Sequence, residues 1–487
     1  MTDMVGDVRR RTTSGVRSVI VLNLASLPLS FATNILLGRV SADALGYYGA
    51  VYVLVGTYFT FGVFGGSMVL TRVVPAMARR DRVSFVLSYV ALVLVFYAAL
   101  VIVIPFTAAG PLYRWLGQLG VPSPSLAAWI LLATVPMGFA SYFLYATLRS
   151  ASAALTEKTV VAGFFVAAAV GVLLWRERLA ADPAGYVWSA ALWIYVSAAA
   201  VGVCLVARTE ESRAAAPLRW FLPAGFWSAV SYTSLSNVVN FVYRTLTPSM
   251  VLVWLDIPTL GRFHAALRYV ALLEFVPAAV ASVLAPSVSQ LTAAGFRAQG
   301  FGQLAAAVRT TQLLTTPAVL GLILFSGDAM AVFGPQFREH GQILAVVALS
   351  ALAGPTVLCG AGVAAAVGAF RGYLAASLAY VVLAVSLTVG LVPLLGVRGA
   401  ALAVTAGAFV RQSAILLVLR RLGLPQIPRV AASWLCSLGS LVLAWWLAPS
   451  RLLASVLWLG CMAAFVIAGG VTYEELRVIT RRLAGRE

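Results

Sequence analysis

Charged residues are scarce in this sequence. Asp, Glu, Lys and Arg together make up 10% of the 487 residues, whereas about 25% is usual in a soluble globular domain. Hydrophobic residues make up 61%, and apolar runs long enough to cross a membrane as a helix recur from end to end. Because these runs are continuous and do not alternate in polarity, the sequence excludes a transmembrane β-barrel and indicates an all-α polytopic membrane protein.

Reactive and metal-binding side chains are equally scarce. The four cysteines lie singly in apolar stretches, without the spacing of a disulfide framework or a zinc site, and the two histidines are isolated. No phosphate-binding loop or nucleophile–base pattern occurs, so the sequence argues against ATP-driven transport by this chain alone and predicts no metal or cofactor. The net charge of +18 is spread over short loops, which argues against nucleic-acid binding.

Apolar length divides the chain into about fourteen predicted spans. With the N-terminus inside, 23 Lys and Arg residues fall on the cytoplasmic side, eight on the outer side and three within spans. This asymmetry follows the positive-inside rule and predicts that both termini are cytoplasmic. The predicted spans are 18–38, 47–70, 83–106, 126–148, 158–175, 186–207, 222–254, 263–291, 310–327, 341–367, 372–395, 399–419, 428–448 and 452–472.

Two stretches share a pattern offset by 215 residues. Each has a short outer loop that ends in Leu-Gly, with the glycine at Gly46 in the first copy and Gly261 in the second. An aromatic residue and a long helix follow, with a proline at the inner end, Pro75 or Pro286. Transporters are commonly built from such repeats, with the substrate site between the halves. We therefore predict two pseudo-symmetric six-helix lobes, followed by two extra helices and a cytoplasmic tail, at 1–215, 216–425, 426–472 and 473–487.

Four segments together resemble a known family. They contain LGYYGAVYVL, PTLGRFHAALRYV, AVFGPQFREH and LVPLLGVRGAA, of which FGPQF and GVRGAA are the most distinctive. In this order they are similar to the landmarks of polysaccharide-lipid flippases, the O-antigen-type branch of the multidrug/oligosaccharidyl-lipid/polysaccharide (MOP) exporter superfamily. The resemblance implies two lobes in a V that open alternately to either side of the membrane.

The same resemblance implies a function. It points to a non-enzymatic flippase that moves a polyprenyl-diphosphate-linked oligosaccharide across the cytoplasmic membrane of a bacterium or archaeon, for cell-surface polysaccharide assembly. It also implies a polysaccharide polymerase or ligase as a partner. The charged first-helix motifs of lipid II flippases have no match in this sequence, which makes a peptidoglycan precursor the less favoured cargo.

Four charged residues lie well inside predicted spans, away from their ends: Arg244, Arg268, Glu274 and Arg411. Arg244 and Glu274 lie on either side of a short turn near 256–261, at matching depths of roughly 18–20 Å for a rise of 1.5 Å per residue. Arg244 therefore has two interpretations, a structural ion pair with Glu274 or, with Arg268, a cationic site for a diphosphate, which guanidinium groups bind well. We expect Arg411 to snorkel to the inner interface.

Polar neighbours complete the predicted site. Asn237 and Asn240 lie on the same helix as Arg244 and are expected to donate hydrogen bonds to phosphate or sugar. Asn34 on the first helix has the same candidate role, with a contact between helices as the alternative. Glu274 is the candidate for proton or sodium coupling, because a carboxyl group in apolar surroundings exchanges its proton nearer to neutral pH.

Two other functions stay open. A multidrug/cation antiporter of the same superfamily would need acidic residues in its cavity, whereas the charges here are mostly arginines. A membrane-embedded glycosyl transferase or ligase would need acids or histidines for general-base catalysis in a sizeable outer loop. The predicted outer loops are short and their acidic residues are scattered.

Overall fold

A computed structural model of the protein contains helices and connections, without β-strands among the residues that it describes. It describes residues 21–423, apart from 23, 62–68, 71–72, 75–76, 108–116, 148, 214–216, 218–219, 224–225, 228–229, 231–244, 294–296 and 367–369. Helices are the expected form, because a chain in hydrocarbon must satisfy its backbone hydrogen bonds internally.

The chain forms two compact units. Unit 1 comprises Met1–Ala265 with Val332–Gln336, and unit 2 comprises Ala266–Ala331 with Phe337–Glu487. The helices that begin in unit 1 are Leu24–Val40, α2 (Ala42–Phe61), α4 (Arg79–Thr107), α6 (Pro124–Ala146), α7 (Ser150–Leu174), α8 (Arg176–Ala181), α9 (Pro183–Ala207), α10 (Glu210–Arg213), α12 (Thr247–Trp254) and α13 (Ile257–Ala293). Those that follow are α14 (Arg297–Leu324), α15 (Ser326–Ala331), η3 (Pro335–His340), α16 (Gly341–Leu349), η4 (Ser350–Ala353), α17 (Gly354–Ala366) and α18 (Phe370–Arg421).

Eight helices within the described residues are long and apolar enough to cross a membrane. They correspond to the predicted spans four to six and eight to twelve, and the shorter apolar helix Leu24–Val40 matches the first. The protein is therefore a multi-pass α-helical membrane protein, as the sequence predicted. The count of fourteen stays a prediction, because the last two predicted spans lie outside the described residues.

Helix starts in unit 1 are set by capping residues. Ser123 accepts a hydrogen bond from the amide of Leu126 ahead of α6, and Asp182 accepts one from Gly185 ahead of α9, each followed by a proline in the first turn. Asp256 caps α13 in the same way, through the amide of Thr259 at 2.6 Å. Such caps satisfy amides that the first helical turn leaves without partners. They allow neighbouring apolar helices to follow one another through very short turns.

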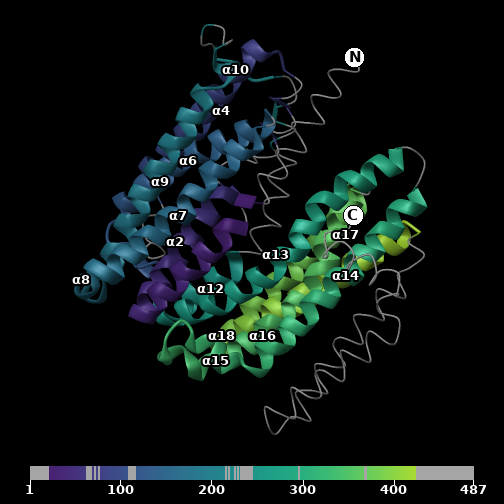
Figure 1. The fold of residues 1–487 in the computed structure, drawn as a ribbon. Helices are drawn as coiled ribbons and strands as arrows, with labels where there is room; N and C mark the ends of the chain where they lie inside the picture. The colour runs from purple at the N-terminus through teal and green to yellow at the C-terminus, as the bar shows by residue number, and fades with distance from the viewer. Residues whose placement is uncertain are drawn as a thin grey trace. The chain divides into compact units, whose positions relative to one another are not determined.

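In unit 1, α6, α7 and α9 pack against one another and α2 packs against α9 (Figure 1). An aromatic core ties α4 to α6, with the rings of Tyr89 and Phe139 4.9 Å apart in an edge-to-face arrangement. Phe226, beyond α10 in the sequence, packs on the same Tyr89 ring at 4.9 Å. These fully or nearly fully buried rings fix the relative positions of the elements of the unit.

The two repeat-related glycines touch each other's helices. A Cβ atom on Gly46 would collide with the carbonyl oxygen of Ile257, and one on Gly261 would collide with the carbonyl oxygen of Ala42. Ala42 and Ile257 each lie four residues before the glycine of their own copy, so the contact is reciprocal. The sequence repeat thus has a counterpart in structure, a pseudo-symmetric crossing of α2 with the start of α13 that only glycine allows.

Unit 2 contains α14, α16, α17 and both arms of α18 (Figure 1). The two arms of α18 meet at Gly396, whose φ of 60° lies in the left-handed region that glycine adopts readily. Each arm is a candidate membrane span, Ala375–Leu395 and Val397–Arg421. The sequence predicted two helices here with a turn at the GVRG segment, and the kink confirms it.

The division into two units does not test the predicted lobe boundary at residue 215, which stays a prediction. Part of the predicted second lobe, 216–265 and 332–336, belongs to unit 1. The segment 332–336 includes most of the FGPQF motif, and its Gln336 donates a hydrogen bond to the carbonyl oxygen of Gly38 at 2.7 Å. The motif singled out in the sequence therefore anchors the end of the first helix.

Candidate functional site

Three of the predicted site residues, Arg244, Asn237 and Asn240, lie outside the described residues. The described chain resumes at Thr245 in a wide, π-type helical turn that leads into α12, with Pro248 in the first turn. The predicted ion pair between Arg244 and Glu274 therefore stays a prediction.

Arg268 and Glu274 both lie on the part of α13 that belongs to unit 2 and within the candidate span Ile257–Ala281. Both side chains are partly buried. Six residues along a helix separate them by about 120° around its axis and about 9 Å along it. The helix is held in place next to Arg268, because Tyr269 donates a hydrogen bond to the carbonyl oxygen of Ala329 at 2.6 Å.

Glu274 lies against the start of α17. A Cβ atom on Gly354 would stand 3.5 Å from the Cγ atom of Glu274, so the absence of a side chain at this position gives the carboxylate room. The candidate coupling residue thus faces the start of α17.

Arg411 is the residue whose surroundings the sequence analysis predicted wrongly. Its side chain is not directed to the surface: the residue is only 7% exposed, and its guanidinium carbon lies 5.6 Å from the centroid of the Tyr380 ring. The ring face attracts a cation and shields it from lipid. The partner lies 31 positions away in the sequence, on the other arm of α18, so helical periodicity alone could not have identified it.

Asn34 lies in unit 1 and is fully buried. Its amide nitrogen donates to the carbonyl oxygen of Ser30 on the same helix at 2.5 Å, while its side-chain oxygen has no hydrogen-bond partner among the described residues. Asn34 is therefore placed inside the packed unit, which leaves its predicted contact with cargo as a proposal.

Glu157 is a carboxylate that the sequence analysis assigned to a connection. The structure begins α7 at Ser150, eight residues before the predicted span, so Glu157 lies in the second turn of a membrane helix. Tyr145 on α6 donates a hydrogen bond to its Oε2 atom at 3.4 Å, and Lys158 acts on it electrostatically. The sequence signal for this earlier helix start was the alanine-rich segment that begins at Ser150, because alanine has the highest helix propensity.

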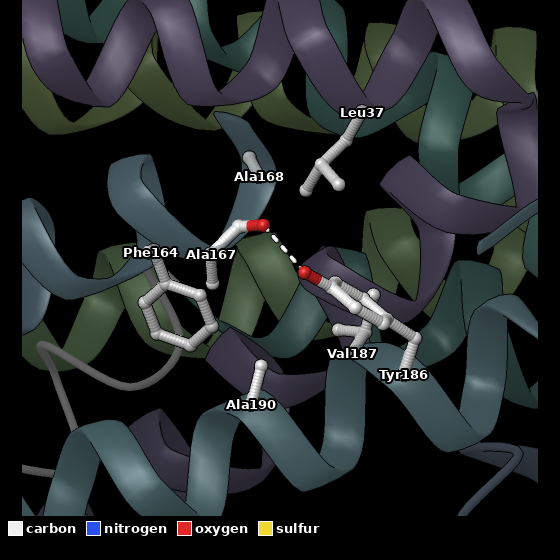
Figure 2. Close-up of a pocket in the computed structure, with 7 residues that line it drawn as sticks. All are labelled: Leu37, Phe164, Ala167, Ala168, Tyr186, Val187 and Ala190. Carbon is white, nitrogen blue, oxygen red and sulfur yellow. Dashed lines mark hydrogen bonds between the residues drawn. The ribbon is translucent and has the colours of Figure 1, made fainter. Parts of the chain in front are cut away.

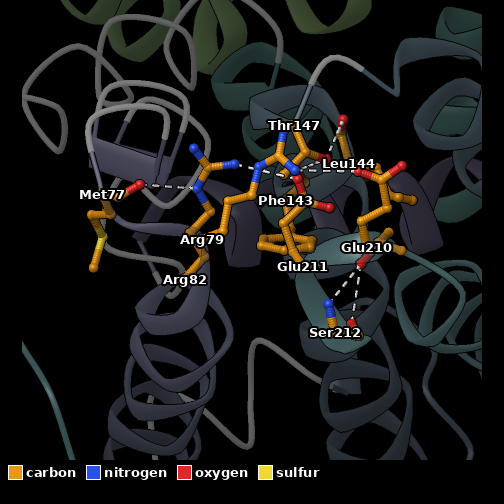
Figure 3. Close-up of polar contacts among 10 residues, drawn as sticks. Met77, Arg79, Arg82, Phe143, Leu144, Thr147, Glu210, Glu211 and Ser212 are labelled. Atoms are coloured by element: carbon orange, nitrogen blue, oxygen red, sulfur yellow. Dashed lines mark hydrogen bonds and ion pairs between the residues drawn. The ribbon is translucent and has the colours of Figure 1, made fainter. Parts of the chain in front are cut away.

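Ion pairs join α4 to α10 at the predicted cytoplasmic side of unit 1 (Figure 3). Arg82 contacts Glu211 at 3.3 Å with side chains 15% and 9% exposed, and its Nε atom donates to the carbonyl oxygen of Met77 at 3.2 Å. Arg79 contacts Glu210 at 3.4 Å, but both side chains are more than half exposed. These pairs connect the ends of helices.

A small cavity in unit 1, of about 10 Å³, is lined mostly by apolar side chains (Figure 2). The hydroxyl group of Tyr186 at its edge is occupied, because it donates to the carbonyl oxygen of Ala167 at 2.6 Å. Ligand sites usually measure about 300–1,000 Å³, so this cavity is a packing gap too small for a glycan head group. The described residues also contain no group of three or more His, Cys, Asp and Glu side chains arranged to hold a metal ion.

Comparison of the sequence with known proteins finds a relative that matches only a short stretch of the chain. No family model matches the chain. A stretch of 118 residues is 26% identical to the probable low-salt glycan biosynthesis flippase Agl15 of Haloferax volcanii, and it spans 24% of this chain and 25% of that protein. The chain therefore matches about a quarter of the length of this relative.

Solved structures share the fold over far more of the chain. The lipid II flippase MurJ in an inward closed conformation superposes with a TM-score of 0.66 at 16% identity, over 92% of this chain and 97% of that one. A multidrug resistance MATE transporter of the MOP superfamily in an outward-facing conformation superposes with a TM-score of 0.55 at 12% identity, over 86% and 96%. These proteins are flippases and transporters and not enzymes. The chain therefore has the fold of the MurJ and MATE transporters of the MOP superfamily, as the resemblance of its motifs predicted.

Proposed function

We propose that this protein is a flippase that carries a polyprenyl-diphosphate-linked oligosaccharide across the cytoplasmic membrane by alternating access. The observation that carries the proposal is a flippase fold over nearly the whole chain together with charged side chains of α13, Arg268 and Glu274, inside a membrane span. Ionisable residues at such positions are costly and usually serve a substrate or ion pathway.

The chemistry of the cargo fits cationic side chains. A diphosphate head group carries at least two negative charges and cannot cross hydrocarbon without compensation. Arginine stays charged at every relevant pH and binds phosphate oxygens through two parallel hydrogen bonds. We assign this role to Arg268 and Arg244, with hydrogen bonds from Asn237, Asn240 and Asn34, and we assign proton or sodium coupling to Glu274.

A glycan is the favoured cargo. The short match to a glycan biosynthesis flippase supports it, as does the absence of the charged first-helix motifs of lipid II flippases. In this proposal both termini are cytoplasmic, the membrane is that of a bacterium or archaeon, and a polysaccharide polymerase or ligase receives the flipped product.

Drug or cation antiport is the second candidate. The fold shared with a multidrug MATE transporter and the carboxylate Glu274 within a span favour it. Against it stands the excess of arginines over carboxylates at intramembrane positions, because a cationic drug would be repelled by Arg268 and Arg244.

The test is lipid flipping in proteoliposomes with a fluorescent polyprenyl-diphosphate-sugar. We expect flipping by the wild-type protein and a loss of at least tenfold in the initial rate for Arg268→Gln and for Arg244→Gln. The matched control is Arg398→Gln, because Arg398 is exposed at the start of the second arm of α18, and it should flip at the wild-type rate. No flipping by the wild type, with uptake of a cationic drug instead, would favour the antiporter.

A further inference from the structure

The FGPQF motif lies in a loop whose ends touch. This motif loop, residues 327–341, runs from α15 through η3 to the start of α16. At its base, a Cβ atom on Gly341 would stand 2.6 Å from the backbone nitrogen of Gly327, and Arg338 forms an ion pair with Asp328 at 2.8 Å. Loops of about this length with adjacent ends are compact and frequently functional.

The base of the motif loop is built into unit 2. The residues up to Ala331 and from Phe337 onward belong to that unit. Tyr269 on α13 fixes the first flank by donating a hydrogen bond to the carbonyl oxygen of Ala329 at 2.6 Å. Phe337, the last residue of the motif, is fully buried. Any motion of unit 2 therefore carries the base of the loop with it.

The tip of the motif loop, Val332–Gln336, belongs instead to unit 1. Phe333 is fully buried, and its ring packs edge-to-face on the ring of Phe31 on the first helix, with centroids 5.5 Å apart. Gly38 in the last turn of that helix permits the close approach, because a Cβ atom there would stand 2.7 Å from the carbonyl oxygen of Phe333. The tip thus docks on the end of the first helix.

Hydrogen bonds complete the docking of the tip. The side-chain amide of Gln336 donates to the carbonyl oxygen of Gly38 at 2.7 Å. On the exposed side, Nε of Arg39 donates to the carbonyl oxygen of Val332 at 3.4 Å. A single hydrogen bond adds little net stability, because water replaces it when it breaks. The tip is therefore held by contacts that can break and form again.

The two phenylalanines of the motif are buried in different units, four residues apart. Between them Gly334 adopts a φ of 146°, which residues with a side chain rarely adopt. Pro335, with its restricted φ, begins η3. The motif is thus a bent connection with one aromatic anchor for each unit.

We propose that the motif loop is a latch, whose tip holds the outer end of the first helix through Phe333 and Gln336 and releases it once in each transport cycle. The inference rests on the proposed function, because alternating access requires the two units to move relative to each other. A tip that never released would tether unit 2 to the first helix throughout the cycle. The predicted orientation places the loop on the outer side, so release accompanies opening to the outside.

A reversible cross-link tests the latch. In a protein whose four native cysteines are replaced by alanine, Gly38→Cys and Phe333→Cys place two Cβ atoms 3.0 Å apart, near enough for a disulfide after a small shift. Oxidation should slow flipping of the fluorescent polyprenyl-diphosphate-sugar at least tenfold, and reduction should restore it. Full flipping with the tip cross-linked would overturn the inference.

The matched control for the cross-link joins α7 to α9 within unit 1. Gly163→Cys and Ile194→Cys place their Cβ atoms 3.5 Å apart, and neither residue touches the motif loop. Because both helices belong to one unit, this disulfide should leave flipping at the rate of the reduced protein.

Labelling without cargo separates a failure of the latch from a failure of the proposed function, and it covers a double variant that does not fold. Phe333→Cys and Phe337→Cys, each in the cysteine-free protein in nanodiscs, are compared by their rates of reaction with a polar maleimide. Both phenylalanines are fully buried, so each cysteine reacts when its own part of the loop opens. Release of the tip predicts at least tenfold faster labelling of Phe333→Cys. Equal rates would contradict release, whether or not the protein flips the lipid.

Discussion

The two units place their charges differently. In unit 1 the described ion pairs fasten helix ends, where Arg82 contacts Glu211 and Arg79 contacts Glu210. In unit 2, Glu274 and Arg411 lie far inside membrane helices, and Arg411 is almost fully buried. Charges at helix ends can be hydrated, but charges within a span need compensation from the protein. The difference is one of degree, because unit 2 also has an exposed ion pair at helix ends, Arg338 with Asp328 at 2.8 Å. Its charges within spans belong to the proposed transport site.

The largest effect on stability is expected where a charge of unit 1 is buried. Arg82→Gln leaves Glu211 with 9% exposure and without its ion-pair partner, which should cost about 3 kcal/mol in the free energy of unfolding. The matched control is Arg79→Gln, which breaks an exposed pair worth at most about 1 kcal/mol. Thermal melting of the purified variants measures both. Equal losses would contradict the view that burial distinguishes the two pairs.

A smaller effect is expected at the crossing of α2 with α13. Gly261→Ala places a methyl group against the carbonyl oxygen of Ala42, and overpacking of this kind costs about 2 kcal/mol. Gly46→Ala should cost a similar amount because the contact is reciprocal. Gly302→Ala on α14 is the control, since a Cβ atom there meets nothing within 4 Å. If the melting temperature of Gly261→Ala equalled that of Gly302→Ala, the close crossing would not exist in solution.

The smallest effect concerns the kink of unit 2. Gly396→Ala forces an L-residue into a φ of 60°, which costs about 1 kcal/mol. Gly390→Ala is a matched control six residues earlier, with equal space around its Cβ position and no positive φ. Because Tyr380 and Arg411 contact each other from the two arms that the kink joins, Gly396→Ala should also reduce flipping if unit 2 acts in transport as proposed. A Gly396→Ala protein as stable and active as Gly390→Ala would contradict this role.

Hydropathy predicted the membrane helices well, because burial in lipid is decided by composition over about twenty residues. It was less accurate for helix starts: α13 begins at Ile257 and not at 263, since Asp256 caps a turn that apolar length does not register. The repeat located Gly46 and Gly261 but did not show that they meet. Likewise, the burial of Arg411 depends on Tyr380 on a separate arm, a tertiary contact that periodicity within one helix does not encode.

The most direct test of the proposed function compares three fluorescent substrates in the same wild-type proteoliposomes. They are a polyprenyl-diphosphate-linked oligosaccharide, a neutral glycolipid with the same glycan and no phosphate, and a cationic drug. The account predicts rapid flipping of the diphosphate-linked oligosaccharide, with at least tenfold slower movement of the neutral glycolipid and of the drug. Equal rates for the two lipids, or preferred transport of the drug, would contradict a flippase that recognises the diphosphate through intramembrane arginines.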